Sequence, residues 1–119
     1  MRAVIFSQNI EVATKLAIQI KSLCSINRIC FFTEIDNNIH FLENGDADIV
    51  FLDIVDELTN WQHLYKKMLI ANEKIKIVLL CSDNRYAVKA YEIGAFDYII
   101  KPVSDIRLIK LLKRLLNSE

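Results

Sequence analysis

Glycine and proline are scarce in this sequence, which has two glycines and one proline among its 119 residues. Loop-rich sandwiches and flexible interdomain linkers depend on these residue types, so the sequence leaves little room for either. Residues of the AVILMFWYC set make up 53% of the chain and charged residues 25%, which is a globular composition. A single domain over residues 1–119 with one hydrophobic core is therefore expected.

Cysteine is also rare, and Cys24, Cys30 and Cys81 are the three in the chain. An odd number of cysteines cannot pair fully. None of them lies at the C-x-x-C spacing of a zinc or redox motif. We therefore expect reduced thiols in the core of a cytosolic protein, rather than disulfides or a metal site.

The chain carries no net charge, because 15 basic residues balance 15 acidic ones. Nothing in this total favours a nucleic acid or a membrane surface as a partner. No apolar run approaches the length of a membrane span or of a signal sequence, so a cytoplasmic protein is expected. The charges are unevenly placed: residues 34–57 hold eight acids and no base, whereas residues 101–114 hold five bases and one acid.

Short apolar runs alternate along the chain with segments of helical period. This alternation predicts an α/β fold in which a doubly wound, five-stranded parallel sheet is covered by five helices. The third run, "IVFL" before Asp53, is apolar at every position, as central parallel strands are. The expected strands cover residues 3–6, 29–32, 49–52, 75–81 and 98–100, and the expected helices cover about residues 12–23, 35–42, 61–71, 84–93 and 105–116.

Polar residues mark the ends of several expected helices. Asp83 or Asn84 can cap the helix that runs to Ile93, where Gly94 supplies a left-handed stop. Ser104 or Asp105 can cap the last helix in the same way.

The expected strands end on residues suited to phosphoryl chemistry. Asp53 ends the third strand, Ser82 follows the fourth, Lys101 ends the fifth, and Ser7 with Gln8 follows the first. Side chains at the carboxyl ends of parallel strands converge on one rim, where such folds bind ligands. A carboxylate can act as the nucleophile there, while an ammonium and a hydroxyl bind the transferred oxygens. The alternative is structural: Asp53 and Ser82 cap a loop and a helix, and Lys101 is a solvated charge.

Two stretches, "DADIVFLDI" and "KIVLLCSDNRYAVKAYEIGAFDYIIKPVS", resemble the receiver domains of two-component response regulators. The likeness follows the whole chain in order and in length, and it implies the flavodoxin-like receiver fold and a signalling domain rather than an enzyme. It implies that Asp53 is the phosphoacceptor, Ser82 the switch hydroxyl and Lys101 the lysine that contacts the phosphoryl group. Tyr98 matches the aromatic residue whose rotamer reports the switch, and Lys101–Pro102 matches the cis peptide bond of the family.

The sequence departs from the family directly after the first strand, where receivers usually carry a pair of acids that helps to hold Mg²⁺. Here "FSQN" places Ser7 and Gln8 at those positions, and Asn9 restores no carboxylate. Mg²⁺ is held mainly through carboxylates and phosphates, so Mg²⁺ binding is expected to be weak or absent, which would slow phosphorylation. Ser7 and Asn9 are interpreted instead as caps of the first helix.

The loop after Asp53 also departs from the family, because "IVDELTN" lacks the Met-Pro and the later glycine of typical receivers. Asp56 and Glu57 can lend carboxylates from this side, although solvated loop acids are the favoured interpretation. Without Mg²⁺ or phosphate, the Asp53 carboxylate is expected to pair with Lys101 and to hold one conformation.

In receivers the fourth helix, fifth strand and fifth helix form the output and dimerisation face. The resemblance therefore implies a homodimer or an output domain as a partner through this face, and a histidine kinase as the phosphate source. Ile106 and Leu111, at the edges of the apolar stripe of the last helix, favour a partner there. The charged residues that match the face, and that can pair across a two-fold axis, are Arg85, Lys89, Glu92, Asp97, Arg107 and Arg114.

Three interpretations compete. The first is a receiver domain from the N-terminal part of a longer, atypical response regulator, and the second is a pseudo-receiver that binds proteins independently of phosphate. The third, a small flavodoxin-like enzyme, conflicts with the absence of a Gly-rich turn after the first strand, since the glycines stand at 45 and 94. His40 and His63 lie off the strand ends, which argues against catalysis by histidine. Direct nucleic-acid binding is not expected, because no stacking aromatics are interleaved with the bases of the last helix.

Overall fold

The computed structural model describes residues 1–23, 28–45, 47–55 and 60–117, and its strands form one parallel sheet. The strand order is β2-β1-β3-β4-β5. The chain moves from β1 outward to β2, then returns across β1 to β3 and continues to β5, which is the flavodoxin-like arrangement. The predicted fold class is confirmed. The strands are β1 Arg2–Phe6, β2 Arg28–Phe32, β3 Ile49–Asp53, β4 Lys76–Cys81 and β5 Asp97–Ile100.

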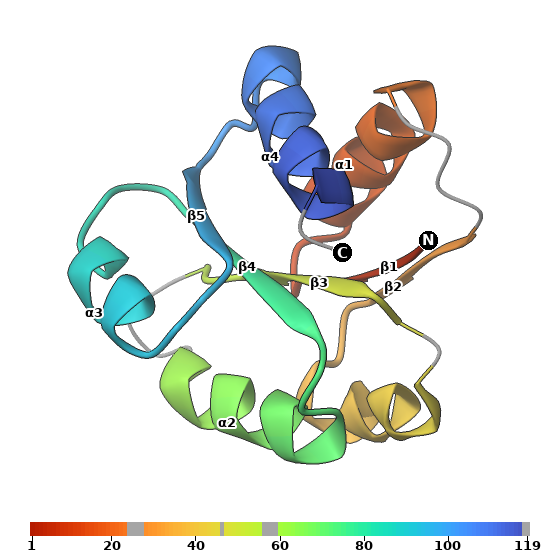
Figure 1. Cartoon of the computed structure of the whole chain (residues 1–119), viewed down its shortest axis with the longest axis vertical. Helices are drawn as coiled ribbons and strands as arrows, with labels where there is room; N and C mark the ends of the chain where they lie inside the picture. Colours follow the sequence, from red (N-terminus) through yellow and green to blue (C-terminus); the bar gives the residue numbers. More distant parts are fainter. Residues whose placement is uncertain (24–27, 46, 56–59, 118–119) are drawn as a thin grey trace.

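Helices cover both faces of the sheet. Figure 1 shows α1 and α4 side by side on one face, with α2, α3 and the yellow segment η1 on the other. Because η1 takes the second helical place, the helix expected fourth is α3 and the helix expected fifth is α4. Their bounds are α1 Ile10–Leu23, η1 Asp36–Asn44, α2 Trp61–Ala71, α3 Ala87–Glu92 and α4 Asp105–Asn117.

The two-sided cover explains why the central strands are apolar throughout. In β1, Ala3 and Ile5 pack with α1 and α4, while Val4 and Phe6 pack with η1 and α2. Successive side chains of a strand point to opposite faces, so a strand covered on both sides needs an apolar residue at every position. All five residues of β3 are buried, and Asp53 is the one ionisable residue among them.

Two of the expected helix ends are confirmed. Gly94 follows α3 with φ of 91°, the left-handed conformation that a glycine adopts without strain. The Ser104 hydroxyl accepts a hydrogen bond from the Arg107 backbone N–H at 3.1 Å, so Ser104 caps α4. Asp105 is then the first residue of that helix.

The start of α3 differs from the prediction. Asp83 does not cap it, because its carboxylate accepts the Arg85 backbone N–H at 3.0 Å and also binds the Arg85 guanidinium. This side-chain turn delays the helix until Ala87. The hydrogen bond from Arg85 also lowers the pKa of the Asp83 carboxyl.

The segment expected as a weak helix over residues 35–42 is a 3-10 helix that continues to Asn44. Asparagine side chains compete with the helical backbone for hydrogen bonds, and the Asn38 amide donates to the Glu34 carbonyl at 2.6 Å. Gly45, at φ of 70°, closes the segment.

Two simpler expectations concern thiols and membranes. Cys30 and Cys81 are free thiols and Cys81 is buried, whereas Cys24 lies outside the described residues. Among the helices that the structure describes, none is long and apolar enough to cross a membrane.

Candidate functional site

The parallel register brings the predicted site residues to one edge of the sheet. Phe6 of β1 lies opposite Leu52 of β3, so the next residues, Ser7 and Asp53, also lie opposite each other. On the other side of β3, Asp53 pairs with Leu80 of β4. Lys101 follows β5 at the same edge, where its backbone N–H donates to the Cys81 carbonyl at 2.8 Å.

Asp53 and Lys101 form a close ion pair at this edge. The Lys101 Nζ lies 2.6 Å from the Asp53 Oδ1, and the carboxylate is 0% exposed while the lysine side chain is 17% exposed. A carboxylate removed from water in this way is costly unless a charge or hydrogen bonds compensate it. The pair that the sequence predicted for a site without phosphate is therefore present.

Ser7 supplies the second partner of the carboxylate. Its side chain is fully buried, and its hydroxyl donates to the Asp53 Oδ2 at 2.8 Å. The Asn9 carbonyl lies 3.1 Å from the same hydroxyl, but one proton serves one acceptor at a time and the carboxylate is both closer and charged.

Ser7 was predicted as a cap of the first helix, and this prediction is wrong for the helix itself. Asn9 does the capping, since its Oδ1 accepts the Glu11 backbone N–H at 3.0 Å. The Ser7 hydroxyl accepts the Asn9 N–H at 3.1 Å and so braces the turn before α1. The parallel register explains why Ser7 does not cap the helix. It places Ser7 beside the Asp53 carboxylate, three residues before α1 begins.

The two oxygens of Asp53 differ in what they accept. Oδ2 accepts the aligned hydrogen bond from Ser7, whereas Oδ1 has no hydrogen-bond donor of regular geometry among the described residues. The Lys101 contact is therefore an ion pair rather than an aligned hydrogen bond. Oδ1 is the atom of the site that retains unused acceptor capacity.

Among the described residues, the side chains in contact with Asp53 are Ser7 and Lys101, and neither is a carboxylate. Asp53 and Ser7 bring one carboxylate and one hydroxyl to the site, Lys101 brings a positive charge, and the Gln8 side chain is exposed. Mg²⁺ is usually bound through one or two carboxylates together with phosphate oxygens and water, and an ammonium repels it. No group of three or more His, Cys, Asp or Glu side chains gathers within the described parts of the chain. Asp56 and Glu57 lie outside those parts.

Ser82 and Tyr98 occupy different positions around the site. Ser82 is exposed and lines a cavity of about 250 Å³ with Ile54 and Asp83, and it makes no hydrogen bond to Asp53. Tyr98 is buried, and its hydroxyl donates to the Asp83 carbonyl at 2.7 Å. Burial is the main cause that raises the pKa of Tyr98. Its side chain thus points inward and connects β5 to the segment before α3.

The peptide bond between Lys101 and Pro102 is cis, as the resemblance implied. The predicted site residues are thus divided: Ser7 and Lys101 contact Asp53 directly, Tyr98 reaches the neighbouring segment, and Ser82 with Gln8 lies exposed at the rim.

The charged residues expected to pair across a two-fold axis are largely engaged within the chain. Asp97 is 2% exposed and accepts from the Arg107 guanidinium at 2.7 Å and from the Arg114 guanidinium at 3.1 Å. The hydrogen bond to Asp97 raises the pKa of Arg107. Lys89 lies 4.0 Å from Glu92 within α3. The cluster of Asp97, Arg107 and Arg114 joins β5 to α4, because both arginines extend from one side of the helix toward the edge strand.

Apolar side chains do lie exposed on α3, β5 and α4. Val88 is 74% exposed, Ile100 is 48% exposed and Ile106 is 70% exposed. Leu111 was expected at the edge of the stripe on α4, but it is fully buried against the sheet. The stripe is rotated so that Ile106 alone of the two faces outward.

The family of the chain is shown by comparison with known proteins. A family model of the response regulator receiver domain matches residues 8–113. The chain belongs to this family. Receivers are signalling modules of two-component systems, and the matched region includes Asp53 and Lys101.

Two similar proteins, and a solved structure of a domain of one of them, are informative. Protein MrkE of Klebsiella pneumoniae is 34% identical over 77 residues, which cover 65% of this receiver and 29% of MrkE. Transcriptional regulatory protein BtsR of Escherichia coli K12 is 40% identical over 68 residues, which cover 57% of this receiver and 28% of BtsR. The crystal structure of the response regulatory domain of MrkE has a TM-score of 0.81 and 26% identity, covering 99% of this receiver and 97% of that chain. The matched regions thus span less than a third of the length of the two relatives.

The contact of Ser7 with Asp53 is the feature of the site that sequence reasoning missed. The signal was present, because Phe6 and Leu52 are opposite each other in neighbouring parallel strands, and the residues that follow them are Ser7 and Asp53. His40 and His63 are exposed on η1 and α2, and neither is among the residues that contact Asp53.

Proposed function

We propose that this chain is the receiver domain of an atypical response regulator, which signals through Asp53 and the face formed by α3, β5 and α4. In this proposal Mg²⁺-dependent phosphorylation of Asp53 is impaired. The observation that carries it is the hydrogen bond from the buried Ser7 hydroxyl to Asp53, at a place where receivers usually hold an acid. A hydroxyl carries no negative charge, so it cannot offset the charge of the metal.

The state of Asp53 supports the same proposal. The carboxylate is 0% exposed, and both of its oxygens face groups of the protein. A phosphodonor reaches Oδ1 only after Lys101 shifts, and without the metal the negative charge between donor and carboxylate is poorly neutralised. Lys101 is then the residue that holds the transferred phosphoryl oxygens.

The direct test is intact-mass measurement after incubation with acetyl phosphate or phosphoramidate and Mg²⁺. We expect a slow mass gain of one phosphoryl group, and no gain in the Asp53→Asn variant. A rate equal to that of an ordinary receiver measured alongside would refute the impairment. A gain that persists in Asp53→Asn would refute Asp53 as the acceptor.

A second candidate is a pseudo-receiver that binds a protein partner without phosphate. The preformed ion pair between Lys101 and Asp53 favours it, because the pair holds one conformation in the unmodified chain. No mass gain with either phosphodonor, together with unchanged partner binding in Asp53→Asn, would select this candidate.

The output is proposed from the relatives. BtsR is named a transcriptional regulatory protein and is much longer than the region it shares with this chain. We propose that this receiver likewise regulates transcription as part of a longer protein, with a histidine kinase as its phosphate source and an output domain or a second copy at the α3, β5 and α4 face.

A further inference from the structure

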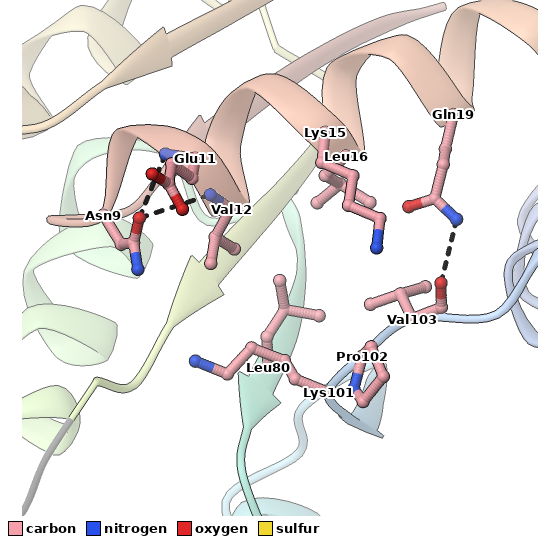
Figure 2. Close-up of a pocket in the computed structure, with 10 residues that line it drawn as sticks. All are labelled: Asn9, Glu11, Val12, Lys15, Leu16, Gln19, Leu80, Lys101, Pro102 and Val103. Carbon is pink, nitrogen blue, oxygen red and sulfur yellow. Dashed lines mark hydrogen bonds between the residues drawn. The ribbon is translucent and has the colours of Figure 1, made fainter.

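A cavity of about 380 Å³ lies between α1 and the connection from β5 to α4, beside the Asp53 site (Figure 2). Its volume lies within the range of cavities that bind small molecules, roughly 300–1,000 Å³. Most of its wall is apolar. The apolar residues of this wall are Val12 and Leu16 of α1, Leu80 of β4, and Pro102 with Val103 of the connection.

Hydrogen bonds on the far side of the cavity join α1 to the connection that leads to α4. The Gln19 amide donates to the Val103 carbonyl at 2.8 Å, the dashed contact in Figure 2, and to the Asp105 carboxylate at 3.0 Å. These bonds fix the spacing between α1 and the start of α4. A ligand would therefore meet walls that are already in place, which lowers the entropic cost of binding.

Lys15 provides a positive charge at the cavity. Its side chain is exposed, and it makes no ion pair or hydrogen bond with the described residues. Figure 2 shows its ammonium extending from α1 toward the connection that carries Pro102 and Val103. Glu11 lies one turn earlier, toward Asn9 at the other end of the cavity. A ligand with one negative charge suits this arrangement, whereas a second negative charge would meet Glu11.

Lys101 belongs to both the cavity and the phosphoacceptor site. Its side chain lines the cavity, while its ammonium lies 2.6 Å from the Asp53 carboxylate. In Figure 2 that ammonium points away from Lys15. A molecule in the cavity therefore packs on the aliphatic part of Lys101. Any movement of Lys101 changes both the wall of the cavity and the ion pair with Asp53.

We propose that this cavity binds a small organic monoanion, a carboxylate with an apolar body, and that its occupancy is coupled to Asp53 through Lys101. The apolar walls cover the body of the ligand and Lys15 pairs with its carboxylate. Such a site gives a receiver with a poor metal site an input that needs no phosphoryl transfer. Coupling of this kind is reciprocal, so a change at Asp53 must alter the affinity of the cavity.

The binding test uses 4-phenylbutyrate and its uncharged amide, titrated into the isotope-labelled chain without Mg²⁺ or phosphodonor and followed by amide NMR. We expect saturable shifts at Lys15, Leu16 and Val103 with the acid, and about three- to fivefold weaker binding of the amide, the effect of a partly exposed ion pair. Lys15→Gln should remove the preference for the acid. Lys21→Gln, on the same helix outside the cavity, should preserve it.

The coupling test repeats the titration on Asp53→Asn. Loss of the Asp53 charge leaves the Lys101 ammonium unpaired, so we expect the acid to bind about threefold more tightly. Equal binding of acid and amide, shifts that map away from the cavity, or no saturation would overturn the site. An unchanged affinity in Asp53→Asn would overturn the coupling. Because no phosphodonor is present, neither result depends on whether Asp53 is phosphorylated.

Discussion

The carboxylate of Asp53 has two unequal neighbours, and their difference governs what the residue can do. Lys101 neutralises its charge at 2.6 Å, and Ser7 satisfies the other oxygen at 2.8 Å. Removing one partner of a buried pair leaves the other charge uncompensated, which costs more than the pair itself contributes. The two members of the pair are not equivalent, because the lysine is partly exposed and the carboxylate is not.

This asymmetry predicts the result of a double-mutant cycle on the pair. Lys101→Met strands a buried carboxylate and should lower the free energy of unfolding by about 3 kcal/mol. Asp53→Asn leaves a lysine that can reach water, so its cost should be about 1 kcal/mol. The double variant should be more stable than Lys101→Met alone. Urea unfolding of the four proteins measures the cycle, and strictly additive losses would contradict a direct interaction.

Ser7 offers a second test at the residue scale. Ser7→Asp places a second carboxylate beside Asp53, where two like charges destabilise the fold until a divalent cation binds them. We expect the variant to melt below the wild type without Mg²⁺ and to regain stability as Mg²⁺ is added, by about 1.4 kcal/mol at ten times the dissociation constant.

Thermal unfolding with and without MgCl₂ measures the effect of this substitution. Ser7→Asn is the matched control, because it has a similar shape and no charge. A melting temperature of Ser7→Asp that does not respond to Mg²⁺ would mean that the metal needs more than this one acid.

At the scale of elements, β5 and α4 are joined by charge as well as by apolar packing. The Asp97 carboxylate accepts hydrogen bonds from the guanidinium groups of Arg107 and Arg114. It also accepts the Tyr98 backbone N–H at 2.8 Å. The cluster fixes how α4 lies against the edge strand. The surface formed by α3, β5 and α4 is therefore built on an internal ion cluster with exposed apolar residues around it.

The cluster predicts a graded response to substitution. Asp97→Asn leaves two arginines without their acceptor beside a buried position, and we expect a loss of about 2 kcal/mol in the free energy of unfolding. Arg114→Gln should cost less than about 1 kcal/mol, because its side chain is 56% exposed and water replaces the contact. Urea unfolding ranks the two variants. An equal loss in both would show that exposure does not weaken the Arg114 contact.

At the scale of the whole molecule, the parallel alternation of the sequence was enough to predict the fold and the edge that carries the site. Apolar runs of strand length set β1 to β5, and their shared direction brought Asp53 and Lys101 together. The Ser7 contact was missed because a serine before a helix has a local explanation, the cap, that needs no tertiary partner. The Asp97 cluster was missed for a related reason: the rotation of α4 depends on how the leucines of its stripe pack, which local patterns do not specify.

The late start of α3 has the same kind of cause. Asp83 and Asn84 are good capping residues by type, but Arg85 competes for the Asp83 carboxylate at a separation of two residues. Asp83 can cap the helix or accept a hydrogen bond from Arg85, and its residue type does not decide between the two. A tertiary contact also acts on this residue, because the Tyr98 hydroxyl of β5 donates to the Asp83 carbonyl.

Two buried tyrosines connect this packing to the behaviour of the whole fold at high pH. Burial raises the pKa of Tyr98 and of Tyr65 above the ordinary value of 10.0. Above about pH 10 the unfolded chain therefore loses phenolic protons that the folded chain keeps, so stability falls as pH rises. The contribution is fully present below the unfolded pKa and is lost as pH climbs through the folded pKa.

Tyr98→Phe should reduce this alkaline loss, because one of the two buried hydroxyls is gone, while Tyr65 maintains the remainder. At neutral pH the same variant should be less stable by about 1 kcal/mol, since the Asp83 carbonyl loses its donor. Tyr91→Phe removes a hydroxyl from a side chain that is 57% exposed and whose hydroxyl contact with the Asp97 carboxylate is long at 3.5 Å, so it serves as the control. Urea unfolding across the alkaline range measures all three proteins. A slope of stability against pH that is the same in Tyr98→Phe and in the wild type would mean that Tyr98 ionises as readily in the folded chain as in the unfolded one.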